Sequence, residues 1–178
     1  GFYSNWYQQL PVVSENQTIV NGYIITGYKE LVDDMVISTG IYTRAVNSLS
    51  NDDVRVSRRL YVPSSRLRGF ESGKVGPKDG DDHVGGNYVV TFNTSSTIPY
   101  VLQTQENMDL KLFFDAGNVW GVDYSSSLDD SNTIRSSTGL ALEITTPIGP
   151  LSFSFAQVLT KASTDKTESF KFQLGTTF

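Results

Sequence analysis

Cysteine is absent from the 178 residues, and histidine occurs once. Without cysteine the chain has no disulfide bond, thiolate metal ligand or thiol nucleophile, although the redox compartment stays open. The formal net charge of −5 is mild and argues against non-specific binding to nucleic-acid phosphates. No stretch approaches the roughly 18 consecutive apolar residues of a transmembrane helix. A membrane-spanning β-strand needs only about 10 alternating residues, so that absence leaves a β-barrel open.

The chain does contain segments in which apolar and polar residues alternate with a period of two. Near the chain end, Phe170, Phe172, Leu174, Thr176 and Phe178 share one face, because successive side chains of a strand point to opposite sides. Similar alternation occurs in five earlier segments: 34–46, 87–93, 108–115, 134–144 and 151–156. Two further segments are rich in β-formers but harder to phase: 1–11 and 18–31. This pattern predicts roughly eight strands of bilayer-spanning length.

Short turns and longer polar loops alternate along the chain. The turns at 31–34 and 147–150 are short, whereas 121–132, 161–168 and above all 47–85 are long. In an up-and-down antiparallel sheet every second connection lies at the same end. The long loops would therefore gather at one end and the short turns at the other, as in outer-membrane barrels.

Alternation alone does not say which face is buried. A soluble sandwich or lipocalin-like barrel turns its apolar face inward, whereas a membrane barrel turns it towards lipid. The polar face here mixes Gly and Ala with isolated charges, which favours the membrane barrel. Aromatic residues also lie near predicted strand ends, where an interfacial girdle would be: Tyr100, Trp120, Tyr124 and Phe178. We expect an all-β, antiparallel, up-and-down transmembrane β-barrel as a single domain over 1–178, with 47–85 as a long inserted loop. A soluble β-sandwich binding module is the alternative.

Seven stretches also carry a resemblance when taken together and in order: Leu67–Phe70, Val75–Pro77, Val84–Asn87, Phe113–Trp120, Ile134–Gly139, Pro147–Ala156 and Phe170–Phe178. They resemble the C-terminal part of the barrel of the BamA family, the bacterial surface-antigen family of outer-membrane protein assembly factors. The resemblance runs from about residue 64 to the last residue. It implies about half of the family's barrel strands, without the family's periplasmic N-terminal domains.

In that family an Arg-Gly-Phe motif lies at the tip of a long loop that folds into the barrel lumen. Carried over, the lumen-loop motif is Leu67, Arg68, Gly69 and Phe70, with Leu67 in place of the commoner Val, and Asp115 is the acidic partner of Arg68. The family often has a second acidic residue on the preceding strand, where this sequence has Ser95. The chemistry agrees with the carry-over, because a guanidinium fork suits a carboxylate and glycine permits a close approach to a wall. The competing interpretation is a solvated loop arginine.

The resemblance implies a non-enzymatic function: insertion and folding of β-barrel proteins in the outer membrane of a Gram-negative bacterium. A lateral seam at the last strand, with Phe170, Phe172 and Leu174, would open and template an incoming strand. The terminal Phe178 would serve as a C-terminal targeting signal. Implied partners are outer-membrane lipid, unfolded outer-membrane proteins as clients and assembly-complex lipoproteins, and open sheet edges suggest edge-to-edge self-association. A related translocation barrel, such as a two-partner secretion transporter or a TamA-like protein, is the alternative.

Other candidate sites are weaker. His83 lies in KDGDDH, which is typical of a polar turn, and the Asp-rich segment 127–132 lacks the spacing of a calcium loop. No phosphate loop, nucleophile elbow or pair of catalytic carboxylates stands at a convincing position. The remaining lumen charges are expected to pair with one another, Asp109 and Glu143 with Lys111 or Arg135. The arginine cluster fits a loop in an acidic lumen better than nucleic acid: Arg55, Arg58, Arg59, Arg66 and Arg68. We expect no enzyme activity, cofactor, metal or nucleic-acid partner.

Overall fold

The computed structural model describes residues 3–14, 18–32, 35–49, 53–99, 101, 107–122, 124–128, 132–147 and 149–175, with side chains from Met35 onward. Its strands are β1 (Tyr3–Ser14), β2 (Thr18–Val32), β3 (Met35–Ser48), β4 (Lys78–Asp79), β5 (Asp82–His83), β6 (Tyr88–Thr97), β7 (Met108–Trp120), β8 (Arg135–Thr146), β9 (Gly149–Thr160) and β10 (Phe170–Leu174). Two short 3-10 turns are η1 (Val56–Arg58) and η2 (Ser126–Leu128). None of the helices in these ranges is long and apolar enough to cross a membrane.

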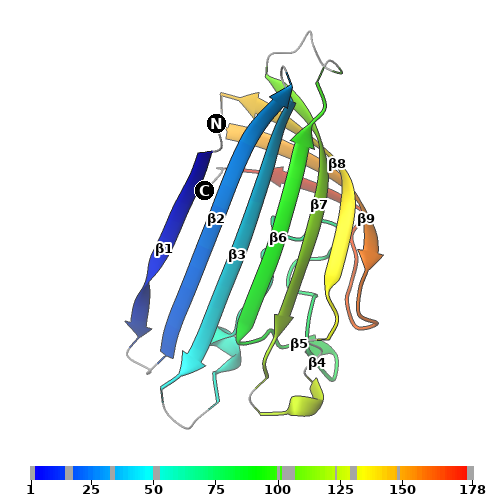
Figure 1. Ribbon diagram of the computed structural model, residues 1–178. Helices are drawn as coiled ribbons and strands as arrows, with labels where there is room; N and C mark the ends of the chain where they lie inside the picture. The colour runs from blue at the N-terminus through cyan, green and yellow to red at the C-terminus, as the bar shows by residue number, and fades with distance from the viewer. Residues whose placement is uncertain are drawn as a thin grey trace.

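Eight of the strands form one antiparallel sheet in the order β1-β2-β3-β6-β7-β8-β9-β10, while β4 and β5 pair as a separate hairpin. This order confirms the predicted all-β, up-and-down architecture and the strand count. The sheet curves strongly, so that β8, β9 and β10 turn away behind the wall formed by β2, β3, β6 and β7 (Figure 1). β1 and β10 are the two edges of the sheet as described.

The outer face of the sheet is apolar and exposed. Its large side chains are 36–62% exposed and come from six strands: Ile41, Tyr88, Val90, Phe92, Leu112, Leu140, Phe155, Leu159, Phe170, Phe172 and Leu174. Neighbouring rings pair across strands there, Phe153 with Phe172 at 5.1 Å and Phe155 with Phe170 at 4.9 Å between centroids. A soluble sandwich would bury this face. The alternative of a soluble β-sandwich is therefore wrong.

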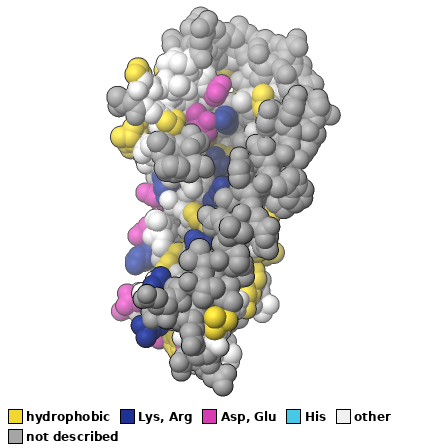
Figure 2. Space-filling model, turned by 90° about the vertical axis from the view of Figure 1, so that its left-hand side faces the viewer, with side chains coloured by type: hydrophobic (Ala, Val, Ile, Leu, Met, Phe, Trp, Pro, Cys, Tyr) yellow, Lys and Arg dark blue, Asp and Glu magenta, His cyan; other side chains and the backbone are white. Residues whose placement is uncertain are grey.

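The opposite, inner face carries the polar and charged residues, as predicted. Asp115, Arg135 and Ser137 are fully buried there beside Phe113 and Ala141. Seen from the side of β1, the described Lys, Arg, Asp and Glu side chains gather in a band down the molecule, with hydrophobic side chains mainly at its margins (Figure 2). Exposed apolar groups outside and buried charges inside are the arrangement of a membrane barrel.

The long connection between β3 and β6, Leu49 to Asn87, is called the lumen loop below. It lies against the inner face, passing behind β6 and β7 in Figure 1. Its apolar side chains and three from the wall form the buried core: Val54, Leu60, Val62, Leu67, Phe70 and Val75 with Val46, Val89 and Val119. Backbone bonds between Leu60 and Gly86, at 2.8 and 2.9 Å, fasten its two ends together. The predicted loop 47–85 thus supplies most of the dry core of the protein.

Candidate functional site

Arg68 of the lumen loop reaches the inner wall and forms a bidentate ion pair with Asp115 of β7. Its Nε lies 2.7 Å from Asp115 Oδ2 and its Nη2 lies 2.8 Å from Oδ1. The backbone N–H of Arg68 also donates to Oδ2, at 3.1 Å. The Asp115 side chain is 0% exposed and that of Arg68 is 15% exposed. A carboxylate out of water needs such donors, so the pair ties the loop tip to one point of the wall.

Asn93 of β6 completes the site. Its Nδ2 donates to Asp115 Oδ1 at 2.8 Å and to the carbonyl of Arg66 at 2.7 Å. Antiparallel pairing places Asn93 directly opposite Asp115, whereas Ser95 lies opposite Phe113. The residue beside Asp115 is therefore Asn93 and not Ser95, and it is a neutral amide. With the neutral Asn93, the Arg68 cation faces the single carboxylate of Asp115. A second acidic residue at this position would add an unpaired negative charge.

Phe113 and Gly139 form a platform beneath the arginine. The Arg68 guanidinium carbon lies 3.6 Å from the centroid of the Phe113 ring, in cation–π geometry. Gly139 of β8 makes room for that ring, because a Cβ there would lie 2.9 Å from Phe113 Cζ and 1.9 Å from the Phe155 carbonyl oxygen. The platform and the carboxylate together fix both the plane and the direction of the guanidinium.

Gly69 and Phe70 attach the tip to the next strands. Gly69 has a φ of +90°, and a Cβ there would lie 3.0 Å from Ala156 Cβ on β9. Ser137 Oγ of β8 donates to the carbonyl of Arg68. Phe70 and Leu67 are each 1% exposed, in the core. All four motif residues therefore contact or pack near the wall, and the solvated-arginine interpretation does not hold.

A second buried ion pair lies beside the first and was not predicted. Arg135, at the start of β8, binds Asp165 of the β9–β10 connection, with Nε–Oδ2 and Nη2–Oδ1 distances of 2.9 and 3.1 Å. Both side chains are 0% exposed. Of the expected lumen pairings, that of Lys111 with Glu143 forms. The pair Arg135–Asp165 joins the start of β8 to the β9–β10 connection, 30 residues further along the sequence.

The predicted seam residues lie on the edge strand. β10 pairs with β9 alone, from Phe170 opposite Phe155 to Leu174 opposite Leu151. The side chains of Phe170, Phe172 and Leu174 are 47–59% exposed on the outer face. Phe178, like Tyr100, lies outside the described residues.

In the described part of the chain, no group of three or more candidate metal ligands occurs at His83 or elsewhere. His83 ends the β4–β5 hairpin, whose turn contains Gly80 with a φ of +59°. Its Nε2 lies 3.0 Å from the carbonyl of Thr164, so Nε2 carries the proton and donates. In a neighbouring loop, desolvation and a hydrogen bond to Asp79 raise the pKa of the Tyr124 phenol above its usual value.

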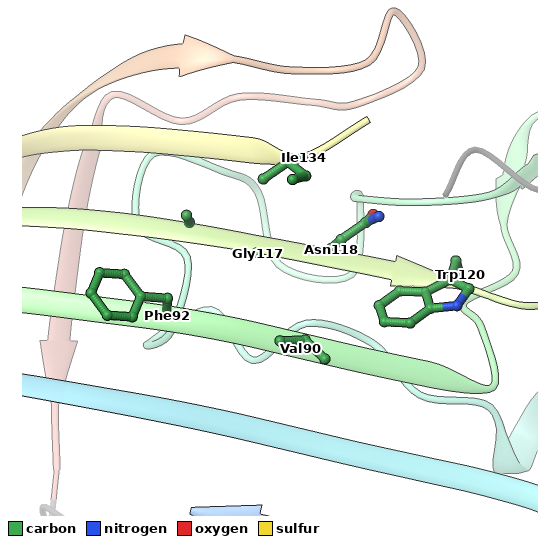
Figure 3. Close-up of a pocket in the computed structure, with 7 residues that line it drawn as sticks. Val90, Phe92, Gly117, Asn118, Trp120 and Ile134 are labelled. Atoms are coloured by element: carbon green, nitrogen blue, oxygen red, sulfur yellow. The ribbon is translucent and has the colours of Figure 1, made fainter. Parts of the chain in front are cut away.

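The outer face has a shallow apolar groove of about 440 Å³ across β6, β7 and β8. Its lining includes the residues labelled in Figure 3: Val90, Phe92, Gly117, Asn118, Trp120 and Ile134. Trp120 stacks on Tyr88 at 5.8 Å near the strand ends, as expected of an interfacial aromatic. A groove with so few polar groups suits hydrocarbon.

The model of the Omp85 superfamily domain matches residues 1–178. The chain belongs to the Omp85 superfamily. This Omp85 domain is 28% identical over 157 residues to the outer membrane protein assembly factor BamA of Neorickettsia risticii, covering 85% of the chain and 21% of the relative. It is 32% identical over 139 residues to BamA of Neisseria meningitidis serogroup B, covering 63% of the chain and 17% of that protein. A SAM50-like protein of Schizosaccharomyces pombe is 31% identical over 128 residues, with coverages of 68% and 26%.

The fold comparison agrees. The crystal structure of BamA from Haemophilus ducreyi lacking POTRA domains 1–3 superposes with a TM-score of 0.82 and 30% identity, covering 97% of this chain and 37% of that one. The Omp85 domain spans 17–26% of the length of these three relatives. The names of these relatives describe outer membrane protein assembly factors and a SAM50-like protein.

Proposed function

We propose that this Omp85 domain is part of an assembly factor that inserts and folds β-barrel proteins in the outer membrane of a Gram-negative bacterium. The observation that carries the proposal is the arginine-tipped loop bound to Asp115 inside an apolar-out sheet, in a chain homologous to BamA barrels. The relatives named above are assembly factors and a SAM50-like protein, which favours assembly over translocation. No chemical step and no cofactor is part of this function.

The working edge in this proposal is β10. Its residues Phe170–Leu174 pair with one flank of β9, and no strand in the described part of the chain pairs with its other flank. Such an edge accepts an extended strand by β-augmentation, in which main-chain bonds give affinity for many sequences. A client strand would add there, with its apolar side chains continuing the row of Phe170, Phe172 and Leu174 towards lipid.

The partners follow from the two faces. Outer-membrane lipid covers the exposed apolar face, and unfolded outer-membrane proteins are the clients of the edge. By homology with the BamA proteins, lipoproteins of an assembly complex are further partners. The same open edge supports edge-to-edge self-association, because an unpaired strand binds any compatible strand. The motif residues Leu67 to Phe70 and Asp115 hold the loop inside while the edge works.

Disulfide capture tests this proposal directly, since the chain has no cysteine of its own. Cysteine replaces Gln173 on β10 in one variant and its register partner Ser152 on β9 in the matched control. Both face the same side, but a strand added to β10 would lie about 5 Å from position 173 and about 10 Å from position 152. A disulfide needs a Cβ–Cβ separation of roughly 4 Å, so only Gln173→Cys should capture cysteine placed in the last strand of a client.

The assay uses protein in phospholipid vesicles and a urea-denatured barrel client, whose folding is followed by its heat-sensitive gel mobility. The expected result is client folding faster than in empty vesicles, with capture at 173 and not at 152. Equal capture at both positions, or no acceleration of client folding, would refute templating at β10.

A further inference from the structure

The β9–β10 connection lies along the lumen loop as a short antiparallel partner. The Glu71 N–H donates to the Lys166 carbonyl, the Lys166 N–H to the Lys74 carbonyl and the Glu168 N–H to the Gly69 carbonyl, each at 3.0 Å. Between these bonds Phe70 pairs with Thr167 as an antiparallel bridge. The segment just past the Arg-Gly-Phe motif is therefore held by the last hairpin as well as by the wall.

Asp165 joins three parts of the chain at one carboxylate. Besides binding Arg135, it accepts the N–H of Gly76 in the lumen loop at 3.1 Å and the N–H of Ala162 at 2.6 Å. Gly76 can lie so close because it has no Cβ, which would lie 2.4 Å from Val119 Cγ1 of β7. The start of β8, the lumen loop and the β9–β10 connection thus share one buried charge pair.

The contacts cover five consecutive residues of the connection, 164 to 168. Thr164 accepts from His83, Asp165 binds Arg135 and Gly76, and the next three pair with the motif segment as described. The chain then enters β10 at Phe170. No more than one residue separates the docked segment from the edge strand.

We propose that the lumen loop is fastened by two clamps, and that the second couples it to the last hairpin. The wall clamp is Arg68–Asp115, and the hairpin clamp is Arg135–Asp165 with Gly76. If the loop left the inner face, Asp165 would lose its hydrogen bond from the Gly76 N–H. Lys166 and Glu168 would lose their backbone hydrogen bonds to the lumen loop. Lifting the hairpin would take the Asp165 carboxylate away from Arg135, which would keep neutral acceptors such as Asn118 Oδ1 and the Thr133 carbonyl, and breaking a buried ion pair in this way is strongly unfavourable. Release of the loop and release of the beginning of β10 are therefore one event, whichever starts it.

The coupling stands without the proposed assembly function; only its use in opening a seam depends on it. Hydrogen exchange of the protein in phospholipid vesicles, without any client, measures the coupling. In Asp165→Asn, which keeps shape and removes charge, peptides covering 67–76 and 162–170 should both exchange at least tenfold faster. In Lys111→Met, which breaks a lumen-wall pair outside the clamps, both should match the parent.

The reciprocal variant is the sharper test. Arg68 makes its side-chain contacts with Asp115 and Phe113, so a purely local role predicts faster exchange in 67–76 alone. Coupling predicts that Arg68→Ala also speeds exchange in 162–170. Acceleration confined to the segment carrying the substitution, in either variant, would overturn the proposal. If Asp165→Asn does not fold, Arg135→Lys, which keeps the charge and loses the fork, is compared in the same way.

Measuring client folding with the same variants tests the coupling of loop and hairpin separately from the proposed assembly function. Coupled exchange with unchanged client folding keeps the two clamps and counts against seam opening as the mechanism of assembly. Local exchange with impaired client folding refutes the coupling and leaves assembly standing.

Discussion

Arg68→Ala should free the tip of the lumen loop while the sheet stays folded. In the parent, Asp115 accepts four hydrogen bonds, from Arg68 N, Nε and Nη2 and from Asn93 Nδ2. The substitution removes the two charge-assisted ones and the contact of the guanidinium with Phe113. Asp115 then remains 0% exposed on the wall without a cation unless the loop leaves and admits water.

Breaking one partner out of a buried pair costs roughly 3–5 kcal/mol, and the cation–π contact adds about 0.5–1 kcal/mol. With every 1.4 kcal/mol worth a factor of ten, loop opening should become roughly 10²- to 10⁴-fold more frequent. Hydrogen exchange at the amides of 67–70 measures that frequency. Trypsin cleavage after Lys74 gives an independent readout.

The double variant Arg68→Met, Asp115→Leu is the control that isolates the charge. It removes both members of the pair, and replacing a whole buried pair by apolar residues is often close to neutral. The double variant should therefore exchange much closer to the parent than Arg68→Ala does. If Arg68→Ala protects these amides as well as the parent, or the double variant is the worse of the two, the reasoning from desolvation is wrong.

Three further outcomes follow from the geometry. Gly69→Ala should destabilise the docked loop by about 1–3 kcal/mol, because its φ is +90° and the new Cβ would press on Ala156, and the same exchange experiment measures it. Phe172→Arg on the outer face should cost up to about 2–4 kcal/mol in lipid, whereas Gln173→Arg on the inner side of the same strand should cost far less; the folded yield in vesicles compares them, and equal losses would contradict the assigned faces. Lys111→Met should change the urea midpoint little, since Lys111 and Glu143 are 23% and 42% exposed and such pairs are worth about 0–1 kcal/mol; a loss as large as that of Arg68→Ala would contradict this.

The sheet was predictable because its signal is local. Alternation with a period of two assigns each residue to one face of the sheet. Segments in which the alternation is nearly unbroken, such as 134–144 and 170–174, keep that assignment in the structure. Even the unpredicted β4–β5 hairpin has a local signal, the Asp79-Gly80 pair that favours tight turns. The lumen loop came from the family resemblance, since nothing in its own periodicity says that it folds inward.

The contacts that were missed depend on information that is not local. Asn93 lies opposite Asp115 only because β6 and β7 pair in the observed register. If β6 were shifted by two residues, Ser95 would lie opposite Asp115 instead. Arg135, at the start of β8, meets Asp165 because the β9–β10 connection docks on the inner side, where Asp165 also accepts the Gly76 N–H of the lumen loop. A buried arginine at a strand start nevertheless demands a carboxylate, and Asp165 was one of the few available on the neighbouring hairpin.

An apolar-out sheet cannot build a hydrophobic core from its own wall, since its large apolar side chains face lipid. The lumen loop resolves this by bringing Leu67, Phe70 and Val75 against Val89 and Val119 on the inside. Hydrophobic packing is non-directional, so these contacts stabilise the loop without fixing where along the wall it lies. The two bidentate arginine pairs supply that position, because each accepts only one carboxylate in one orientation. Stability and register are thus carried by different residues, and a perturbation of the arginines should displace the loop long before it unfolds the sheet.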